Sequence, residues 1–224
     1  MKFMLDTVNL DKIRYYQSVL PLAGVTSNPS IIKKEGKIDF YAHLKAIKEI
    51  IGTAELHVQV VGETKEEIEK DAQNIVEHLG KETFIKIPVN NEGLSALKTL
   101  KSKNFNVTAT AIYTEFQGYL AIAAGADYLA PYYNRMENLN INAADTVAAM
   151  VGEIKRSSAT SQILAASFKN VSQVNHACRS GAQAITASPD IFEQALSMPS
   201  VQKAVNDFHN DWREIFSTEK IYEL

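Results

Sequence analysis

The chain has 224 residues, of which 46% are hydrophobic and 22% are charged, a composition typical of a globular protein large enough for one sizeable core. Its 23 basic and 26 acidic residues argue against a broad basic surface for nucleic acid or membranes, so a small-molecule partner is expected. No apolar run approaches the roughly 20 residues of a membrane span, and the first residues lack a signal-peptide pattern. The sequence therefore predicts a cytoplasmic protein.

The first half of the chain alternates between predicted strands and helices. A short apolar strand over 2–6 is followed by helical spacing over 10–20, which Pro21 ends. A second strand over 22–26 leads into Asn28-Pro29, the pattern of a capped helix start. The next elements are a helix over 40–51, a strand over 55–61, a helix that opens at Thr64 with a capping box, and a strand over 83–89.

The second half continues this alternation without a linker or a change of composition. It predicts strands over 106–111, 128–131, 162–166 and 184–187, helices over 92–103, 114–124, 143–156, 170–180 and 189–196, and a further amphipathic helix over 201–216. Eight such units favour one (β/α)8 TIM barrel domain over 1–224 with an additional C-terminal helix. A doubly wound α/β sheet is the alternative, but it needs a glycine-rich loop where this chain has Asp6-Thr-Val-Asn.

One lysine lies within the predicted buried strand 83–89. Alternation places Lys86 with Phe84 and Pro88 on one face, while the other face carries only apolar residues. Burial disfavours a charged amine and lowers its pKa, which produces the nucleophile that a Schiff base requires. The alternative is a structural lysine that snorkels or pairs with a buried carboxylate.

Polar residues recur where the predicted strands end. In a TIM barrel these ends converge on one mouth, where side chains serve function rather than stability. Each residue alone has a structural explanation, such as helix capping or strand propensity, but seven neighbouring strands share the pattern. The residues are Asp6, Thr26, Asn28, Gln59, Lys86, Thr108, Thr110, Tyr132, Arg135, Ser167 and Lys169.

Other chemistry has little support in the sequence. The five histidines form no i, i+4 pair, and His57, the only one on a strand, is expected to pack in the interior beside Gln59. Cys178 is interpreted as an inert packed thiol. Without a Walker loop, a G-x-S-x-G motif or a ligand cluster, the sequence predicts neither a metal nor a cofactor.

Five ordered motifs resemble the transaldolase family, and most closely its short members, the fructose 6-phosphate aldolases. The motifs are GVTSNPS at 24–30, IKIPV at 85–89, TATAIY at 108–113, APYYNR at 130–135 and LAASFK at 164–169. The resemblance covers essentially the whole chain, including the terminal helix around Trp212.

The resemblance implies a class I aldol mechanism without a cofactor, in which Lys86 forms a Schiff base with a dihydroxyacetone-type donor. It also implies roles for other residues. Asp6 and Asn28 would hold the amine and the donor hydroxyls, with Thr26 also on the substrate side. Gln59, Thr110 and Tyr132 would hold water or move protons. Arg135 and Ser167 would bind the phosphate of a sugar-phosphate substrate, with Lys169 as a further candidate.

Two residues favour the aldolase branch of the family. Transaldolases of this family usually carry glutamate and phenylalanine where this chain has Gln59 and Tyr132. We therefore expect formation and cleavage of fructose 6-phosphate, with dihydroxyacetone and glyceraldehyde 3-phosphate as the other partners. The alternatives are a transaldolase of the pentose phosphate pathway, a phosphosugar isomerase or epimerase that uses a carboxylate base, and a non-catalytic barrel.

The resemblance further implies a homo-oligomer, a pentameric ring or a decamer of two rings, in which the last helix contacts a neighbour. Trp212 and Phe216 would anchor that contact. The alternative is that the helix over 201–216 folds back over its own barrel.

Overall fold

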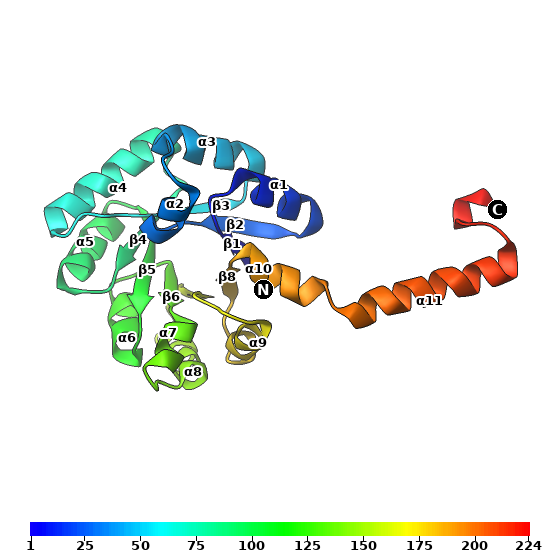
Figure 1. Ribbon diagram of the computed structural model, residues 1–224. Coiled ribbons are helices and arrows are strands. Elements are labelled where there is room, and N and C mark those ends of the chain that lie inside the picture. The colour runs from blue at the N-terminus through cyan, green and yellow to red at the C-terminus, as the bar shows by residue number, and fades with distance from the viewer.

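The computed structural model describes residues 1–224 and contains one closed barrel of eight parallel strands, numbered in chain order around the barrel (Figure 1). The predicted TIM barrel is confirmed, and the doubly wound sheet is wrong. The strands are β1 (Lys2–Asp6), β2 (Leu22–Thr26), β3 (Glu55–Gln59), β4 (Phe84–Pro88), β5 (Asn106–Ile112), β6 (Tyr128–Pro131), β7 (Gln162–Ala165) and β8 (Ala184–Ala187).

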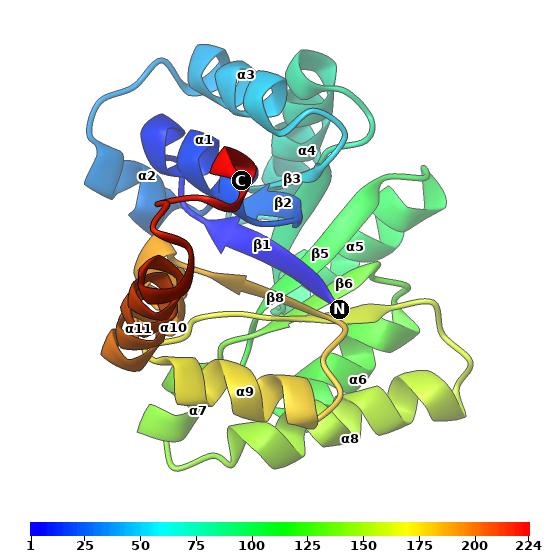
Figure 2. The same ribbon diagram turned by 90° about the vertical axis from the view of Figure 1, so that its right-hand side faces the viewer.

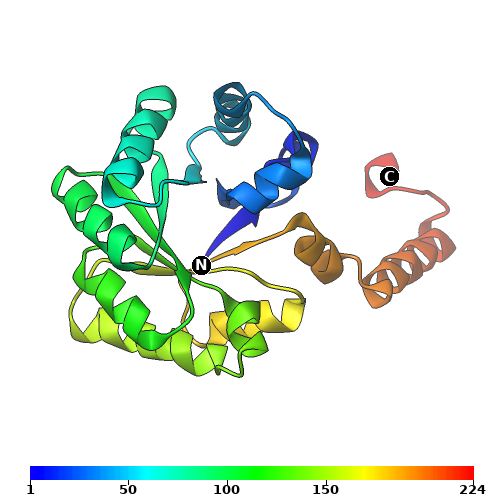
Figure 3. The ribbon, with the colours of Figure 1, turned by 60° about the vertical axis from the view of Figure 1, so that its left-hand side comes forward.

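Helices surround the strands as an outer layer, which Figure 3 shows. They are α1 (Leu10–Val19), α2 (Pro29–Glu35), α3 (Phe40–Ile51), α4 (Lys65–Leu79), α5 (Asn91–Ser102), α6 (Glu115–Ala123), α7 (Tyr133–Asn138), α8 (Ala143–Arg156), α9 (Val171–Arg179), α10 (Pro189–Leu196) and α11 (Pro199–Phe216), with a final 3-10 turn at Ile221–Glu223. None of them is both long enough and apolar enough to cross a membrane.

Side-chain caps fix where most of these helices begin. Asn28 accepts a hydrogen bond from the backbone N–H of Ile31 at the start of α2, and Thr64 forms the predicted capping box with Glu67 at the start of α4. The helix α7 was not predicted, since residues 132–135 were interpreted only as the end of a strand. It has no side-chain cap and only six residues, so it carries too little pattern to be recognised.

The barrel separates two regions of core. A large apolar cluster fills the layer between the strands and the helices, and includes Ile85 and Ile87 of β4. Inside the barrel the apolar plug is small and consists of Met4, Tyr128, Leu164 and Ala184, with Ala23 and Phe84 packed against it. Because this plug fills only part of the interior, the inner face of the strands is left with room for polar side chains.

The last helix, α11, extends away from the barrel, as Figure 1 shows, and it points toward the viewer in Figure 2. None of its residues is buried, so the alternative in which it folds back over its own barrel is wrong. Its exposed apolar residues are Val201, Val205, Phe208, Ile215 and Phe216.

Candidate active site

A cavity of about 590 Å³ opens at the carboxyl ends of the strands. Every strand or the segment directly after it contributes to the lining, as expected for the catalytic face of a TIM barrel. Eight of the ten residues to which the family resemblance assigns a role line this cavity: Asp6, Asn28, Gln59, Lys86, Tyr132, Arg135, Ser167 and Lys169. The other two, Thr26 and Thr110, are fully buried and hydrogen-bond to Asp6 and Tyr132.

Lys86 lies on the inner face of β4, level with Gln59 on β3 and Thr108 on β5. Its side chain is buried, with only 4% of the residue exposed. The amine Nζ donates one hydrogen bond, 2.8 Å long, to the backbone carbonyl of Ser27, and makes no ion pair. Burial lowers the pKa of Lys86, and the nearby Asp6 carboxylate only partly opposes this shift.

Asp6 is the carboxylate whose charge acts on Lys86, and it lines the same cavity. Its Oδ1 accepts a hydrogen bond of 2.6 Å from Thr26, whose hydroxyl lies 2.7 Å from that of Thr186. Burial raises the pKa of Asp6, against the lowering influence of Lys86 and of the Thr26 hydrogen bond. Burial thus disfavours the charged form of both groups, and each partly offsets the shift of the other.

Thr186 was not predicted, although it follows the same rule as the other candidates. It is buried on β8 and lines the cavity. Alternation along the strand 184–187 places Thr186 on the same face as Ala184, which lies inside the barrel. Following this period in the sequence would therefore have identified it.

Tyr132 and Arg135 lie together on the β6 side of the mouth. The hydroxyl of Thr110 donates to the Tyr132 hydroxyl at 3.1 Å, and burial raises the pKa of Tyr132. The Arg135 guanidinium donates to the Tyr113 hydroxyl at 3.2 Å, a bond that raises the pKa of Arg135. Tyr113 was not predicted, and nothing in its local sequence indicates this contact.

The side-chain oxygen of Gln59 is buried but has no hydrogen-bond partner within the protein. Buried acceptors in folded proteins are nearly always paired. Since Gln59 lines the cavity beside Lys86, its oxygen is available to a substrate hydroxyl or to a water molecule there.

Two non-glycine residues of the cavity lining have left-handed backbone conformations. Ala111 has a φ of 57° and lies at an irregularity in the pairing of β5 with β6. Ser167 has a φ of 64° and lies two residues after the end of β7. Such conformations cost free energy and cluster at functional sites. The carbonyl of Ser167 accepts from the backbone N–H of Asn134 at 3.0 Å, which ties this segment to α7.

Lys169 completes the predicted set. It is exposed at the edge of the cavity, and its backbone N–H donates to Gln173 at 2.7 Å. Lys34 of α2 also lines the cavity and was not predicted.

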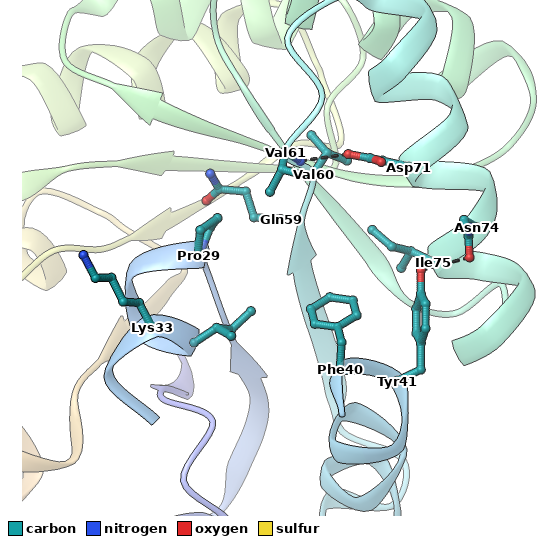
Figure 4. A pocket seen from close by; sticks show the side chains of 11 residues that line it. Pro29, Lys33, Phe40, Tyr41, Gln59, Val60, Val61, Asp71, Asn74 and Ile75 are labelled. Atoms are coloured by element: carbon teal, nitrogen blue, oxygen red, sulfur yellow. Dashed lines mark hydrogen bonds between the residues drawn. The ribbon is translucent and has the colours of Figure 1, made fainter. Parts of the chain in front are cut away.

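A second pocket, of about 530 Å³, lies beside the mouth between α2, α3 and α4 (Figure 4). Gln59 lines both spaces, but the second pocket is mainly apolar and contains neither Lys86 nor Asp6. Asp71 accepts two bonds of 2.8 Å there from the backbone N–H groups of Val61 and Gly62, and the side-chain oxygen of Asn74 accepts one of 2.9 Å from the Tyr41 hydroxyl. The reactive groups therefore belong to the mouth cavity.

No group of three or more His, Cys, Asp or Glu side chains in the structure could hold a metal ion. His57 is fully buried inside the barrel, as predicted, and Cys178 is partly buried. Burial raises the pKa of the Cys178 thiol, which favours its unreactive protonated form.

Comparison with known proteins places the chain in a family. A family model described as Transaldolase/Fructose-6-phosphate aldolase matches residues 3–223. The chain is 54% identical over 222 residues to a probable fructose-6-phosphate aldolase of Streptococcus pneumoniae, covering 99% of this chain and all of that protein. It is also 32% identical over 212 residues to a probable transaldolase of Clostridioides difficile, covering 95% of this chain and 97% of that protein. The resemblance found in the motifs is thus confirmed, and the chain belongs to the transaldolase/fructose-6-phosphate aldolase family.

Proposed function

We propose that this protein is a class I aldolase that cleaves fructose 6-phosphate to dihydroxyacetone and glyceraldehyde 3-phosphate, and that Lys86 forms the Schiff base. The observation that carries the proposal is the buried Lys86 amine, which makes no ion pair and lines the same cavity as Asp6. The names of the family and of the Streptococcus pneumoniae relative support the reaction class.

The reaction begins at the neutral Lys86 amine, whose lowered pKa makes it available as a nucleophile. It attacks the ketone carbon C2 of the sugar and forms a carbinolamine. Asp6 exchanges the protons that allow the carbinolamine hydroxyl to leave as water, so that a protonated Schiff base results. The hydroxyl of Thr26 holds Asp6 in place and is itself hydrogen-bonded to the hydroxyl of Thr186.

Cleavage follows because the protonated Schiff base accepts electrons. Loss of the proton from the C4 hydroxyl breaks the C3–C4 bond, releases the aldehyde and leaves an enamine on Lys86. Tyr132, hydrogen-bonded to Thr110, serves as the acid–base group, and Gln59 holds the water through its unpaired oxygen. Protonation of C3 and addition of water to C2 then release dihydroxyacetone and restore the amine.

The phosphate end of the substrate is assigned to the β6 and β7 side of the mouth. Arg135 and Ser167 line it from adjacent segments, and Lys169 adds a positive charge at the edge. A guanidinium suits phosphate because it presents two parallel N–H donors. Asn28 lies after β2, on the opposite side of the barrel, where it can hold the donor hydroxyls.

Borohydride reduction tests the Schiff base directly. With dihydroxyacetone present, the wild-type protein should gain the mass of the reduced donor on Lys86, located by peptide mass spectrometry. A phosphosugar isomerase or epimerase, or a non-catalytic barrel, would leave the lysine unmodified. Modification at another lysine would show that Lys86 is not the nucleophile.

Transaldolase activity is the second candidate, since the family name includes it and the Clostridioides difficile relative is a probable transaldolase. Both activities share every step up to the enamine. They differ in whether the enamine is protonated or waits for a second aldehyde. Gln59 and Tyr132 favour protonation, because a phenol in the cavity can donate the proton.

We further infer that the protein is a homo-oligomer, a pentamer or a decamer, in which α11 packs on a neighbouring copy. The support is the extended position of α11 and its exposed apolar residues, of which Phe208 is 70% exposed. The rings of Trp212 and Phe216 pack together with their centres 4.4 Å apart and their planes tilted by 32°, and they would form part of that contact.

A further inference from the structure

A column of hydrogen-bonded polar side chains runs through the barrel below Lys86, buried at its upper end and partly exposed at Glu55 and Lys2, and it takes no part in the mechanism above. Its central member is His57, which is fully buried on β3. The imidazole stacks on Phe84 at 4.5 Å between ring centres and meets the edge of Tyr128 at 5.3 Å. Its Nδ1 lies 2.8 Å from the hydroxyl of Thr108, and its Nε2 lies 3.3 Å from a carboxylate oxygen of Glu55.

The column continues from Glu55 to the amino-terminal end of the barrel. The other carboxylate oxygen of Glu55 accepts hydrogen bonds from Lys2 at 2.8 Å and from the Tyr128 hydroxyl at 3.1 Å. Lys2 also donates to Tyr128. The side chains of β1, β3, β5 and β6 are thus joined by one connected set of hydrogen bonds.

These bonds fix the position of the proton on His57. Burial acts to raise the pKa of Glu55, but hydrogen bonds from His57, Lys2 and Tyr128 outweigh it and lower this pKa to about 2. The Glu55 carboxylate is therefore ionised and can only accept hydrogen bonds. Burial lowers the pKa of His57 to about 4, so the ring is neutral. Nε2 therefore carries the single proton, and Nδ1 accepts the proton of the Thr108 hydroxyl.

The top of the column is the layer that holds the lysine. Thr108 is the direct neighbour of Lys86 across the β4–β5 pair, on the same inner face. His57 pairs with Phe84, one inward position below Lys86 on β4. The charge of Lys86 lies close enough to contribute to the lowered pKa of His57, so a charge on either group is felt by the other.

We propose that His57 is a positioning residue for Lys86. Glu55 holds the His57 ring in one tautomer, and the ring in turn fixes the direction of the Thr108 hydroxyl and places an uncharged group beneath the reactive amine. Thr108 cannot turn its hydroxyl proton toward the lysine, because that proton is bonded to Nδ1. The amine donates to the backbone carbonyl of Ser27, and its lone pair is left free for a substrate carbonyl in the cavity above. This inference rests on the proposed role of Lys86 as the Schiff-base residue.

The test measures the rate at which borohydride traps dihydroxyacetone on Lys86, at saturating donor concentration and pH 7. His57→Phe keeps the aromatic stack but removes both ring hydrogen bonds, so trapping should slow by about tenfold to a hundredfold, the upper figure being the loss that a misplacement of about 1 Å can cause. Thr108→Val should slow it equally. The two effects should not add in the double variant, because both remove the same bond.

Two further variants separate positioning from general stability. His57→Gln can donate to Glu55 and accept from Thr108, so it should restore trapping to within about threefold of the wild-type rate. Tyr128→Phe removes a hydrogen bond from the lower end of the same column and leaves the His57–Thr108 bond in place. It should lower the melting temperature while leaving the trapping rate within about twofold of wild type.

Nitrogen-15 NMR of histidine-labelled protein gives an independent measurement. The signal that is absent in His57→Phe should report an Nε2–H tautomer at pH 7, and an Nδ1–H tautomer or a charged ring would overturn the inference. So would unchanged trapping in His57→Phe, or equal slowing in Tyr128→Phe. If the wild-type protein itself is not trapped on Lys86, the proposed function fails and this inference fails with it.

Discussion

The guanidinium of Arg135 lies over the ring of Tyr132, 4.7 Å from its centre. The candidate phosphate ligand and the candidate acid–base group are therefore packed as one unit. Although burial dominates and raises the pKa of Tyr132, the positive charge of Arg135 partly lowers it. Substitution of the arginine should consequently affect both substrate binding and proton transfer, in different proportions.

We expect Arg135→Ala to raise the KM for fructose 6-phosphate by one to two orders of magnitude, since a charge-assisted hydrogen bond contributes about 1.5–3 kcal/mol. The KM for a non-phosphorylated aldehyde should barely change. Because the variant also removes a charge next to Tyr132, kcat should fall by about threefold on both substrates. Steady-state kinetics on the two substrates provide the measurement, and equal changes in KM would indicate a purely structural arginine.

Lys86→Met should abolish both cleavage and borohydride trapping while leaving the fold intact. An apolar chain of similar length replaces a buried amine that has only one hydrogen bond, to Ser27. The free energy of unfolding should therefore change by no more than about 2 kcal/mol. Circular dichroism during urea unfolding checks the stability, and full trapping in the variant would assign the chemistry to another lysine.

Acid should destabilise the protein through His57. The pKa of this ring is lowered by burial from 6.5 to about 4, so the unfolded chain binds a proton that the folded protein excludes. The neutral His57 ring contributes its full stabilisation above pH 6.5. As the pH falls toward 4, the free energy of unfolding should decrease by up to about 3 kcal/mol. Lys2 and Lys86 oppose protonation of the ring, whereas Glu55 favours it.

The measurement is the free energy of unfolding in urea at pH 7, 6, 5 and 4.5, compared between the wild-type protein and His57→Gln. The glutamine cannot titrate, so its curve should fall less steeply over this range. Parallel curves would show that other groups carry the acid sensitivity.

Much of the fold and of the site followed from pattern alone. Eight apolar runs with polar ends are sufficient to predict a barrel, and barrel geometry then brings residues as distant as Asp6 and Ser167 into one cavity. Local sequence patterns are sufficient to find these strand ends, because the few residues at each end determine where the strand stops.

The contacts that escaped prediction depend on register between distant strands. Glu55 meets Lys2 across 53 positions of the chain and Tyr128 across 73. No local pattern encodes which inward side chains face each other, because strand pairing and barrel closure decide it. The capping of α2 by Asn28, in contrast, involves neighbours in sequence and was predictable.

The assembly prediction concerns α11. Deletion of the residues from Val201 onward should give smaller oligomers or insoluble protein, since an apolar helix face would lose its partner surface. A milder variant is Phe208→Ser, with Phe116→Ser on α6 as its matched control, because the two side chains are 70% and 69% exposed. Light scattering after size exclusion should show a smaller assembly only for Phe208→Ser. A truncated chain of unchanged size would rule out the helix contact.

The final prediction separates the aldolase from the transaldolase. Gln59 cannot titrate, so its amide can hold a water molecule but cannot take a proton from it. The proton that enters the enamine must then come from a group such as the Tyr132 phenol, which Thr110 holds at 3.1 Å. A site that protonates the enamine releases free dihydroxyacetone, whereas a site that does so slowly keeps the enamine until a second aldehyde arrives.

We therefore expect the native protein to release free dihydroxyacetone from fructose 6-phosphate, and Tyr132→Phe to lower this rate by about two orders of magnitude, within the range for loss of a general acid–base group. Transfer to erythrose 4-phosphate should fall less, because carbon–carbon bond formation consumes the enamine without protonating C3. Both products can be followed in one assay with and without erythrose 4-phosphate. Efficient transfer by the native protein without release of dihydroxyacetone would assign the protein to the transaldolase branch. Unchanged cleavage by Tyr132→Phe would instead show that a group other than the phenol protonates the enamine.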